Sequence, residues 1–206
     1  MADRYENFAE LAAHERENTD FQIRSETRRD TPAVIAPHGG GIEPGTSELA
    51  EAIAGGDLSF YAFEGLKKDG NGVLHLTSDH LDEPIAIELV SASPTVVALH
   101  GELKCIDKVA FLGGLDKELG QRIRTALEAA EFVVRIHDNP NLQGVNKSNI
   151  CNRGRSGQGV QLEMSRPLRK SFFESFDRSG RERPTKAFSR FVDTIRGAIL
   201  GEPVKK

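Results

Sequence analysis

Short apolar runs alternate with amphipathic segments along this chain of 206 residues, and this alternation limits the possible folds more than any other feature. The runs have the length and composition of buried strands. The amphipathic segments repeat apolar residues every three or four positions, which is typical of helices that pack one face on a core. The pattern predicts a single α/β domain over residues 1–206, with a mixed, largely parallel central sheet flanked by helices.

The boundaries of the expected elements follow from where these patterns begin and end. Strands are expected at residues 20–29, 32–36, 58–63, 73–77, 95–99, 108–112, 132–136 and 160–164. Helices are expected at residues 4–16, 46–54, 83–91, 116–131 and 185–200. The segment 138–159 is long, irregular and rich in Asn, Gly, Ser and Arg, and structureless loops of this length inside a domain are usually functional or disordered.

Charge and composition exclude several classes of protein. A net charge of -4 and the absence of Trp argue against a general binder of nucleic acid. No apolar stretch approaches the roughly 20 residues that a membrane helix needs, and residues 1–10 lack the pattern of a secretory signal. We therefore expect a cytoplasmic monomer without a membrane partner, in which Cys105 and Cys151 are free thiols.

Polar side chains follow several apolar runs directly, at the points where the predicted strands end. Three histidines have this position: His38, His100 and His137. Glu163 lies late in another run, and Glu43 follows His38 across three consecutive glycines. Ligands of open α/β sheets bind at the carboxyl ends of strands, where side chains from neighbouring parallel strands converge. These residues are therefore the first candidates for a functional site.

Imidazole nitrogens and carboxylate oxygens are zinc ligands, and catalytic zinc sites typically combine three protein ligands with one open position. His38 and Glu43 supply two ligands, and either His100 or His137 supplies the third. Glu163 would be the general base that takes a proton from water and passes it to a leaving amine. Strand-end histidines are also common as hydrogen-bonded structural residues. Glu163 has its own structural alternative, a buried ion pair with Arg166 or Arg169.

Basic residues suggest how a substrate could be held. Asn152, Arg153 and Arg155 lie in the long loop before Glu163, and an arginine fork matches a carboxylate. A solvated basic loop is the alternative. The basic run at 166–183 allows a different function, a nucleic-acid-binding replication accessory protein. The glycines at 39–41 could cradle a phosphate, but the Lys-Ser/Thr of a P-loop is missing.

Five blocks of sequence carry a resemblance to a known family. They are His38-Gly39-Gly40-Gly41-Ile42-Glu43, Leu74-His75-Leu76-Thr77-Ser78, Ala98-Leu99-His100-Gly101, Asn149-Ile150-Cys151-Asn152-Arg153 and Gly159-Val160-Gln161-Leu162-Glu163. In this order they resemble the poly-γ-glutamate hydrolase family, which is known in bacteriophages and in bacterial genomes. The likeness extends from about Tyr5 to the last expected helix.

The resemblance implies a hydrolase with one zinc ion and a fold similar to zinc carboxypeptidases. It selects His100 over His137 as the third ligand beside His38 and Glu43, and it implies Glu163 as the base. Substrate binding would involve His75, Thr77, Ser78, Asn152, Arg153 and Arg155. The implied substrate is poly-γ-glutamate, and the enzyme would be released by lysis if it is phage-derived. An alternative substrate class is small N-acyl amino acids such as N-formyl-glutamate.

Overall fold

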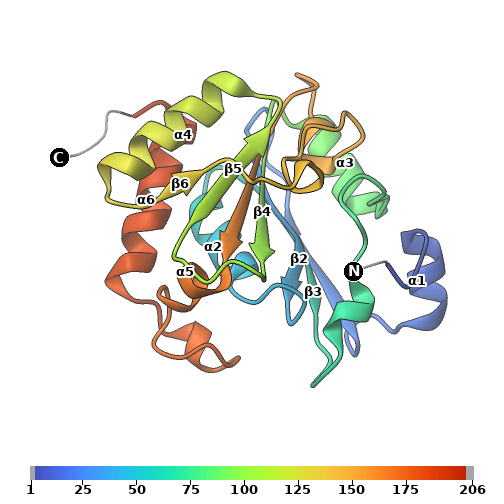
Figure 1. The fold of residues 1–206 in the computed structure, drawn as a ribbon. Helices are drawn as coiled ribbons and strands as arrows, with labels where there is room; N and C mark the ends of the chain where they lie inside the picture. The colour runs from blue at the N-terminus through green and yellow to red at the C-terminus, as the bar shows by residue number, and fades with distance from the viewer. Residues whose placement is uncertain (1–2, 203–206) are drawn as a thin grey trace.

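A seven-stranded mixed sheet runs through the molecule, with helices on both of its faces (Figure 1). The computed structural model describes residues 3–202. The spatial order of the strands is β1-β3-β2-β4-β7-β5-β6. Their bounds are β1 (Phe21–Glu26), β2 (Ala33–Gly40), β3 (Ser59–Gly65), β4 (Val96–Glu102), β5 (Ala110–Gly114), β6 (Val134–Arg135) and β7 (Val160–Ser165). This architecture confirms the α/β fold with a mixed sheet.

The strand directions determine which loops share an edge of the sheet. The central strands β3, β2, β4 and β7 are parallel to one another. β1 pairs antiparallel with β3, and β5 pairs antiparallel with β7, while β6 runs parallel to β5. The carboxyl ends of β2, β4 and β7 therefore lie at one edge, and the segments that follow β5 and β6 lie at the opposite edge.

Two cores cover the two faces of the sheet. Within residues 3–202 the α-helices are α1 (Phe8–His14), α2 (Thr46–Ala54), α3 (Pro84–Ala92), α4 (Lys117–Ala129), α5 (Arg166–Lys170) and α6 (Lys186–Leu200). Helices α2, α4, α5 and α6 pack on one face, and α1 and α3 pack on the other (Figure 1). Successive side chains of a strand point to opposite faces of the sheet, so each strand contributes to both cores. In β2, Val34 and Ala36 belong to the first core, and Ala33 and Ile35 belong to the second.

The strand predicted at residues 73–77 is wrong. Residues Asn71–Leu74 form a short 3-10 helix, η1, and residues 75–77 lie outside the sheet. The Val73 amide bonds to the Gly70 carbonyl and the His75 amide to that of Gly72, so local turns take the bonds that a strand would give to a neighbour. A short apolar run is too short for its hydrophobic periodicity to distinguish a strand from a helical turn.

The other predicted helices and strands differ from the observed ones mostly in where they begin and end. Three more 3-10 helices are present: η2 (Pro140–Leu142) and η3 (Ile150–Asn152) within the long loop, and η4 (Gly180–Glu182) before α6. Cys105 and Cys151 are free thiols, as expected. None of the helices in the described part of the chain is long and apolar enough to cross a membrane.

Candidate metal centre

A bulge near the end of β2 aims the side chain of His38. The pairing of β2 with β3 shifts register between Ala36 and Gly39, which is how a bulge redirects a side chain. In a regular strand, His38 would share the face of Val34 and Ala36. Instead it contacts His100, which continues the opposite face of β4 beyond Ala98. The imidazole is buried in this position.

A tight turn then brings Glu43 back to His38. Gly40 has a φ of 62°, in the left-handed region that glycine enters without strain. The Glu43 amide donates to the His38 carbonyl at 2.8 Å. The Glu43 carboxylate oxygen Oε2 accepts a hydrogen bond from the Gly101 amide at 2.8 Å, which ties the turn to the end of β4. The four intervening residues therefore still allow both side chains to reach one point.

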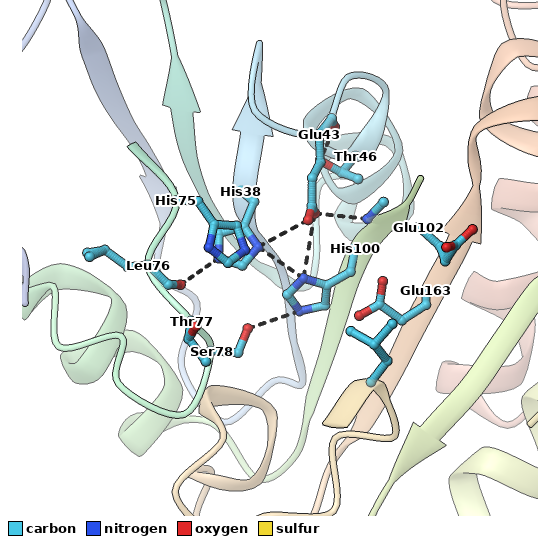
Figure 2. A network of polar contacts seen from close by, with 12 residues as sticks. His38, Glu43, Thr46, His75, Leu76, Thr77, Ser78, His100, Glu102 and Glu163 are labelled. Carbon is cyan, nitrogen blue, oxygen red and sulfur yellow. Dashed lines mark hydrogen bonds and ion pairs between the residues drawn. The ribbon is translucent and has the colours of Figure 1, made fainter. Parts of the chain in front are cut away.

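His100 and Glu163 come from neighbouring parallel strands. They are direct partners in the register of β4 and β7, and both are buried. Figure 2 shows the Glu163 carboxylate beside the His100 ring. The Gln161 side-chain amide donates to Glu163 Oε1 at 3.1 Å. Among residues 3–202, Glu163 makes no ion pair, so the predicted structural alternative of a salt bridge to Arg166 or Arg169 is absent.

One nitrogen of His38, one nitrogen of His100 and the two carboxylate oxygens of Glu43 lie close together at the carboxyl ends of the strands (Figure 2). The two imidazole Nδ1 atoms lie 3.2 Å apart. His38 Nδ1 lies 3.4 Å from Glu43 Oε1, and His100 Nδ1 lies 3.6 Å from Glu43 Oε2. Tetrahedral zinc with bonds of about 2.0–2.1 Å spaces its ligand atoms about 3.3 Å apart. The donor set therefore fits a zinc ion in type and in spacing.

The hydrogen bonds around His38 favour a ring that is ready to bind a cation. His38 Nε2 lies 2.7 Å from the Leu76 carbonyl oxygen, which can only accept, so Nε2 carries the hydrogen. Nδ1 is then the nitrogen that faces Glu43 and His100. A carbonyl partner on the far nitrogen is the usual second contact of a metal-binding histidine. On the other ring, His100 Nε2 lies 3.4 Å from the Ser78 hydroxyl.

His75 is a competing third imidazole that the sequence analysis assigned only to substrate binding. Donor atoms of His38, Glu43 and His75 all lie within 4.8 Å of one another. The His75 ring stacks against His38, with ring centroids 4.0 Å apart. However, His75 Nδ1 is bonded to the Asp3 carboxylate at 2.7 Å. His38 and Glu43 therefore have two candidate imidazole partners, His100 and His75.

Burial and neighbouring charges give the two carboxylates different protonation behaviour. Burial alone would raise the pKa of Glu43, but the His38 and His100 imidazoles outweigh it and hold that pKa well below its usual range. Burial raises the pKa of Glu163 to about 7, although His100 opposes the rise. Glu43 is thus ionised, as a metal ligand must be, while Glu163 is poised to exchange a proton near neutral pH.

The other predicted substrate residues divide into two groups. Ser78 and His75 lie at the converging donors, and the exposed Thr77 lies between them in sequence. Asn152 is buried and uses its side-chain amide to bond the backbone of its own loop. Arg153 donates to the Leu81 carbonyl at 2.8 Å.

Arg155 and His137 lie away from the site. Arg155 pairs with Asp30, and its amide bonds to the Ser93 carbonyl, near the start of β4. His137 follows β6, and its ring packs at a tilt against Phe111. His137 was predicted to lie with His38 and His100 because their strands were expected to run parallel. β6 runs opposite to β4, so His137 lies at the far edge.

A model of the poly-gamma-glutamate hydrolase family matches residues 5–194. The chain belongs to this family. YmaC of Bacillus subtilis (strain 168), a UPF0714 protein, is 36% identical over 203 residues, which are 97% of this chain and 85% of YmaC. The family is a hydrolase family, so membership supports an enzymatic activity.

Solved structures of family members share the whole fold. A bacteriophage poly-gamma-glutamate hydrolase matches with a TM-score of 0.93 and 32% identity, covering 97% of this chain and 98% of the other. A zinc-free structure of YndL matches with a TM-score of 0.91 and 35% identity, with the same coverage. A putative carboxypeptidase A from Shewanella denitrificans, with a TM-score of 0.53 and 16% identity, shows likeness in fold alone.

Arg169 lies beneath the site and was not singled out as a site residue from the sequence. Its side chain is fully buried, and it donates to three carbonyls: Pro44 at 2.5 Å, Met164 at 3.0 Å and Glu102 at 3.3 Å. Pro44 and Met164 are the immediate neighbours of Glu43 and Glu163. Gly101 leaves the space for the guanidinium, since a Cβ there would approach Arg169 Cζ to 2.6 Å. A single cation thus joins the backbone of three site elements.

We expect Arg169→Met to lower the free energy of unfolding by at least about 3 kcal/mol, because two buried carbonyls and one partly buried carbonyl each lose a donor at about 1–3 kcal/mol. Denaturant unfolding of the metal-free protein measures this change. Arg166→Met is the matched control on the same short helix, where the side chain is exposed, and a change within about 0.5 kcal/mol is expected. Equal losses in the two variants would contradict the role assigned to Arg169.

Proposed function

We propose that the chain is a zinc-dependent hydrolase of γ-glutamyl amide bonds in poly-γ-glutamate, with one ion held by His38, Glu43 and His100. The observation that carries the proposal is the convergence of two imidazole nitrogens and a carboxylate at mutual distances of 3.2–3.6 Å. Membership of the hydrolase family supports the substrate. The description of a YndL structure as zinc-free supports the choice of metal.

A zinc ion held by these three residues would have one coordination position left for water or substrate, as is typical of catalytic zinc sites. When bound, zinc would supply a Lewis acid that polarises the amide carbonyl and lowers the pKa of water. Glu43 contributes the negative charge of the ligand set, and its bond from the Gly101 amide holds its orientation. His38 is held in turn by the Leu76 carbonyl.

Glu163 is the proposed general base. It accepts a proton from the attacking water and then donates it to the leaving amine, which must be protonated to depart. Its position on β7, opposite His100 on β4, places it beside the proposed ligands without making it one of them. Gln161 donates to one of its oxygens and so restrains the carboxylate.

The segment that carries His75, Thr77 and Ser78 is the proposed substrate side of the site. Ser78 approaches His100, and His75 covers the ring of His38. Arg153 and the bonded amide of Asn152 are proposed to hold the neighbouring loop in place. Arg155 is not included, because it pairs with Asp30 near the start of β4.

Removal of zinc tests the proposal directly. We expect the purified protein to contain about one zinc per chain and to reduce the viscosity of a poly-γ-glutamate solution. Dialysis against a chelator should abolish this activity, and one equivalent of zinc should restore it. Full activity after complete removal of metal would contradict the proposal.

The same preparation separates the alternative functions. Amine release from N-formyl-glutamate without any action on the polymer would favour a small-molecule deacylase. Salt-dependent DNA binding would favour a replication accessory protein. The structure gives that last alternative little support, since Arg169 is buried, and Arg181 and Arg183 form ion pairs within the molecule.

A further inference from the structure

Asp3 lies against the segment that borders the candidate metal centre. Asp3 Oδ1 is bonded to His75 Nδ1 at 2.7 Å, and Asp3 Oδ2 accepts a hydrogen bond from the Thr77 amide at 2.5 Å. The side chain of Asp3 is only 16% exposed. One carboxylate therefore fixes this segment on both sides of Leu76.

Leu76 supplies the contact that reaches the metal centre. Its carbonyl oxygen lies 2.7 Å from His38 Nε2 and is the partner that leaves His38 Nδ1 free to bind a cation. The segment is outside the sheet, so no ladder of backbone bonds holds that carbonyl in place. The His75 ring, which Asp3 also holds, stacks on the ring of His38 (Figure 2).

We propose that Asp3 is a positioning residue of the metal centre, which fixes the Leu76 carbonyl and the His75 ring and thereby orients His38. The inference rests on the proposed function, because it gives His38 the role of a metal ligand. Two donors, one on His75 and one on the Thr77 backbone, need two acceptors at once, and a carboxylate supplies both. Partners in the outer shell of a metal-binding histidine set its tautomer and ring orientation.

Asp82 provides a matched control within the same region. Its Oδ1 accepts a hydrogen bond from the Phe8 amide at 2.7 Å, so it also attaches the N-terminal segment to the loop that follows Ser78. No described hydrogen bond joins Asp82 to residues 75–77 or to His38. Removal of Asp82 therefore loosens the same N-terminal segment without touching the path to the metal.

The experiment measures zinc dissociation constants by competition with a chromophoric chelator for the wild type and for Asp3→Ala, Asp3→Asn and Asp82→Ala. Loss of outer-shell partners typically weakens metal binding by about 10–100-fold. We expect Asp3→Ala to raise the dissociation constant about tenfold and Asp82→Ala to leave it within about twofold. Asp3→Asn should be intermediate, since its amide oxygen accepts from Thr77 but its amide nitrogen cannot accept from His75.

The visible spectrum of the cobalt-substituted protein gives a second readout that depends on ligand geometry. The bands should shift in Asp3→Ala and stay unchanged in Asp82→Ala. Wild-type affinity and spectrum in Asp3→Ala would overturn the inference, and so would equal weakening in Asp3→Ala and Asp82→Ala. A wild-type protein that binds no zinc would instead overturn the proposed function, and this inference with it.

Discussion

Replacement of Glu163 by glutamine is expected to reduce kcat on poly-γ-glutamate about 10³-fold while zinc remains bound. General acid–base catalysis typically contributes about 10²–10⁴-fold, and an amide cannot accept a proton from water. The substitution keeps the shape of the side chain and leaves the three proposed ligands intact. Single-turnover cleavage of the polymer measures the rate, and metal analysis of the same sample measures zinc.

Glu102 offers a matched control for this experiment. It is also buried at the end of β4, but its two oxygens accept the Lys104 and Cys105 amides at 2.7 and 2.6 Å. These contacts give Glu102 a role in the following turn. Glu102→Gln should therefore keep kcat within about tenfold of the wild type. A Glu163→Gln variant that hydrolyses the polymer at the wild-type rate would exclude Glu163 as the base.

Replacement of His100 by alanine is expected to weaken zinc binding by more than about 100-fold, whereas His75→Ala should weaken it by only about tenfold. The first variant removes a proposed ligand, and the second removes only a ring that packs on His38, an outer-shell loss. Titration calorimetry of the metal-free proteins gives both affinities. His38→Ala does not separate the two ligand sets, because His38 belongs to both.

The reverse order of affinities would assign the third position to His75. In that case the ring would have to leave the Asp3 carboxylate or bind through its other nitrogen. Thermal unfolding of each metal-free variant serves as the control for folding, since both rings lie in or near the buried part of the site. If the two variants unfold at similar temperatures but differ in zinc affinity, the weaker binding is due to the missing ligand and not to a loss of folding.

The central part of the candidate site could be predicted from the sequence because its residues follow strands that run parallel. His38, His100 and Glu163 lie at the ends of β2, β4 and β7, and the shared strand direction brings them to the same end of the sheet. The bulge that turns His38 to the face of His100 does not follow from strand direction. The prediction for His137 was wrong, because a short apolar run does not reveal whether its strand will pair parallel or antiparallel with its neighbours. The family resemblance selected His100 as the third ligand, whereas His75, which also lies beside His38 and Glu43, was not among the predicted ligands.

Long-range backbone contacts were not predictable from local patterns. Arg169 was predicted only as part of a basic run or as an ion-pair partner of Glu163, yet its buried guanidinium bonds to backbone carbonyls, two of which are far away in sequence. The contacts of Asp3 and of the Leu76 carbonyl have no local sequence signal, because Asp3 bonds to the His75 ring and the Thr77 amide 72 and 74 positions away and Leu76 offers only its backbone oxygen. Pro37 and the glycines after His38 did mark an irregularity at the end of β2, and a bulge is present there.

The contacts of Arg169 have a consequence for the order of folding. Its three acceptors belong to the turn after β2, the end of β4 and the end of β7, and the bond to Pro44 spans 125 positions of the chain. Contacts of such sequence separation form slowly, because much loop entropy is lost before they are gained. The metal centre is therefore complete only once these strands are paired, and zinc would stabilise the native state without rescuing partly folded chains.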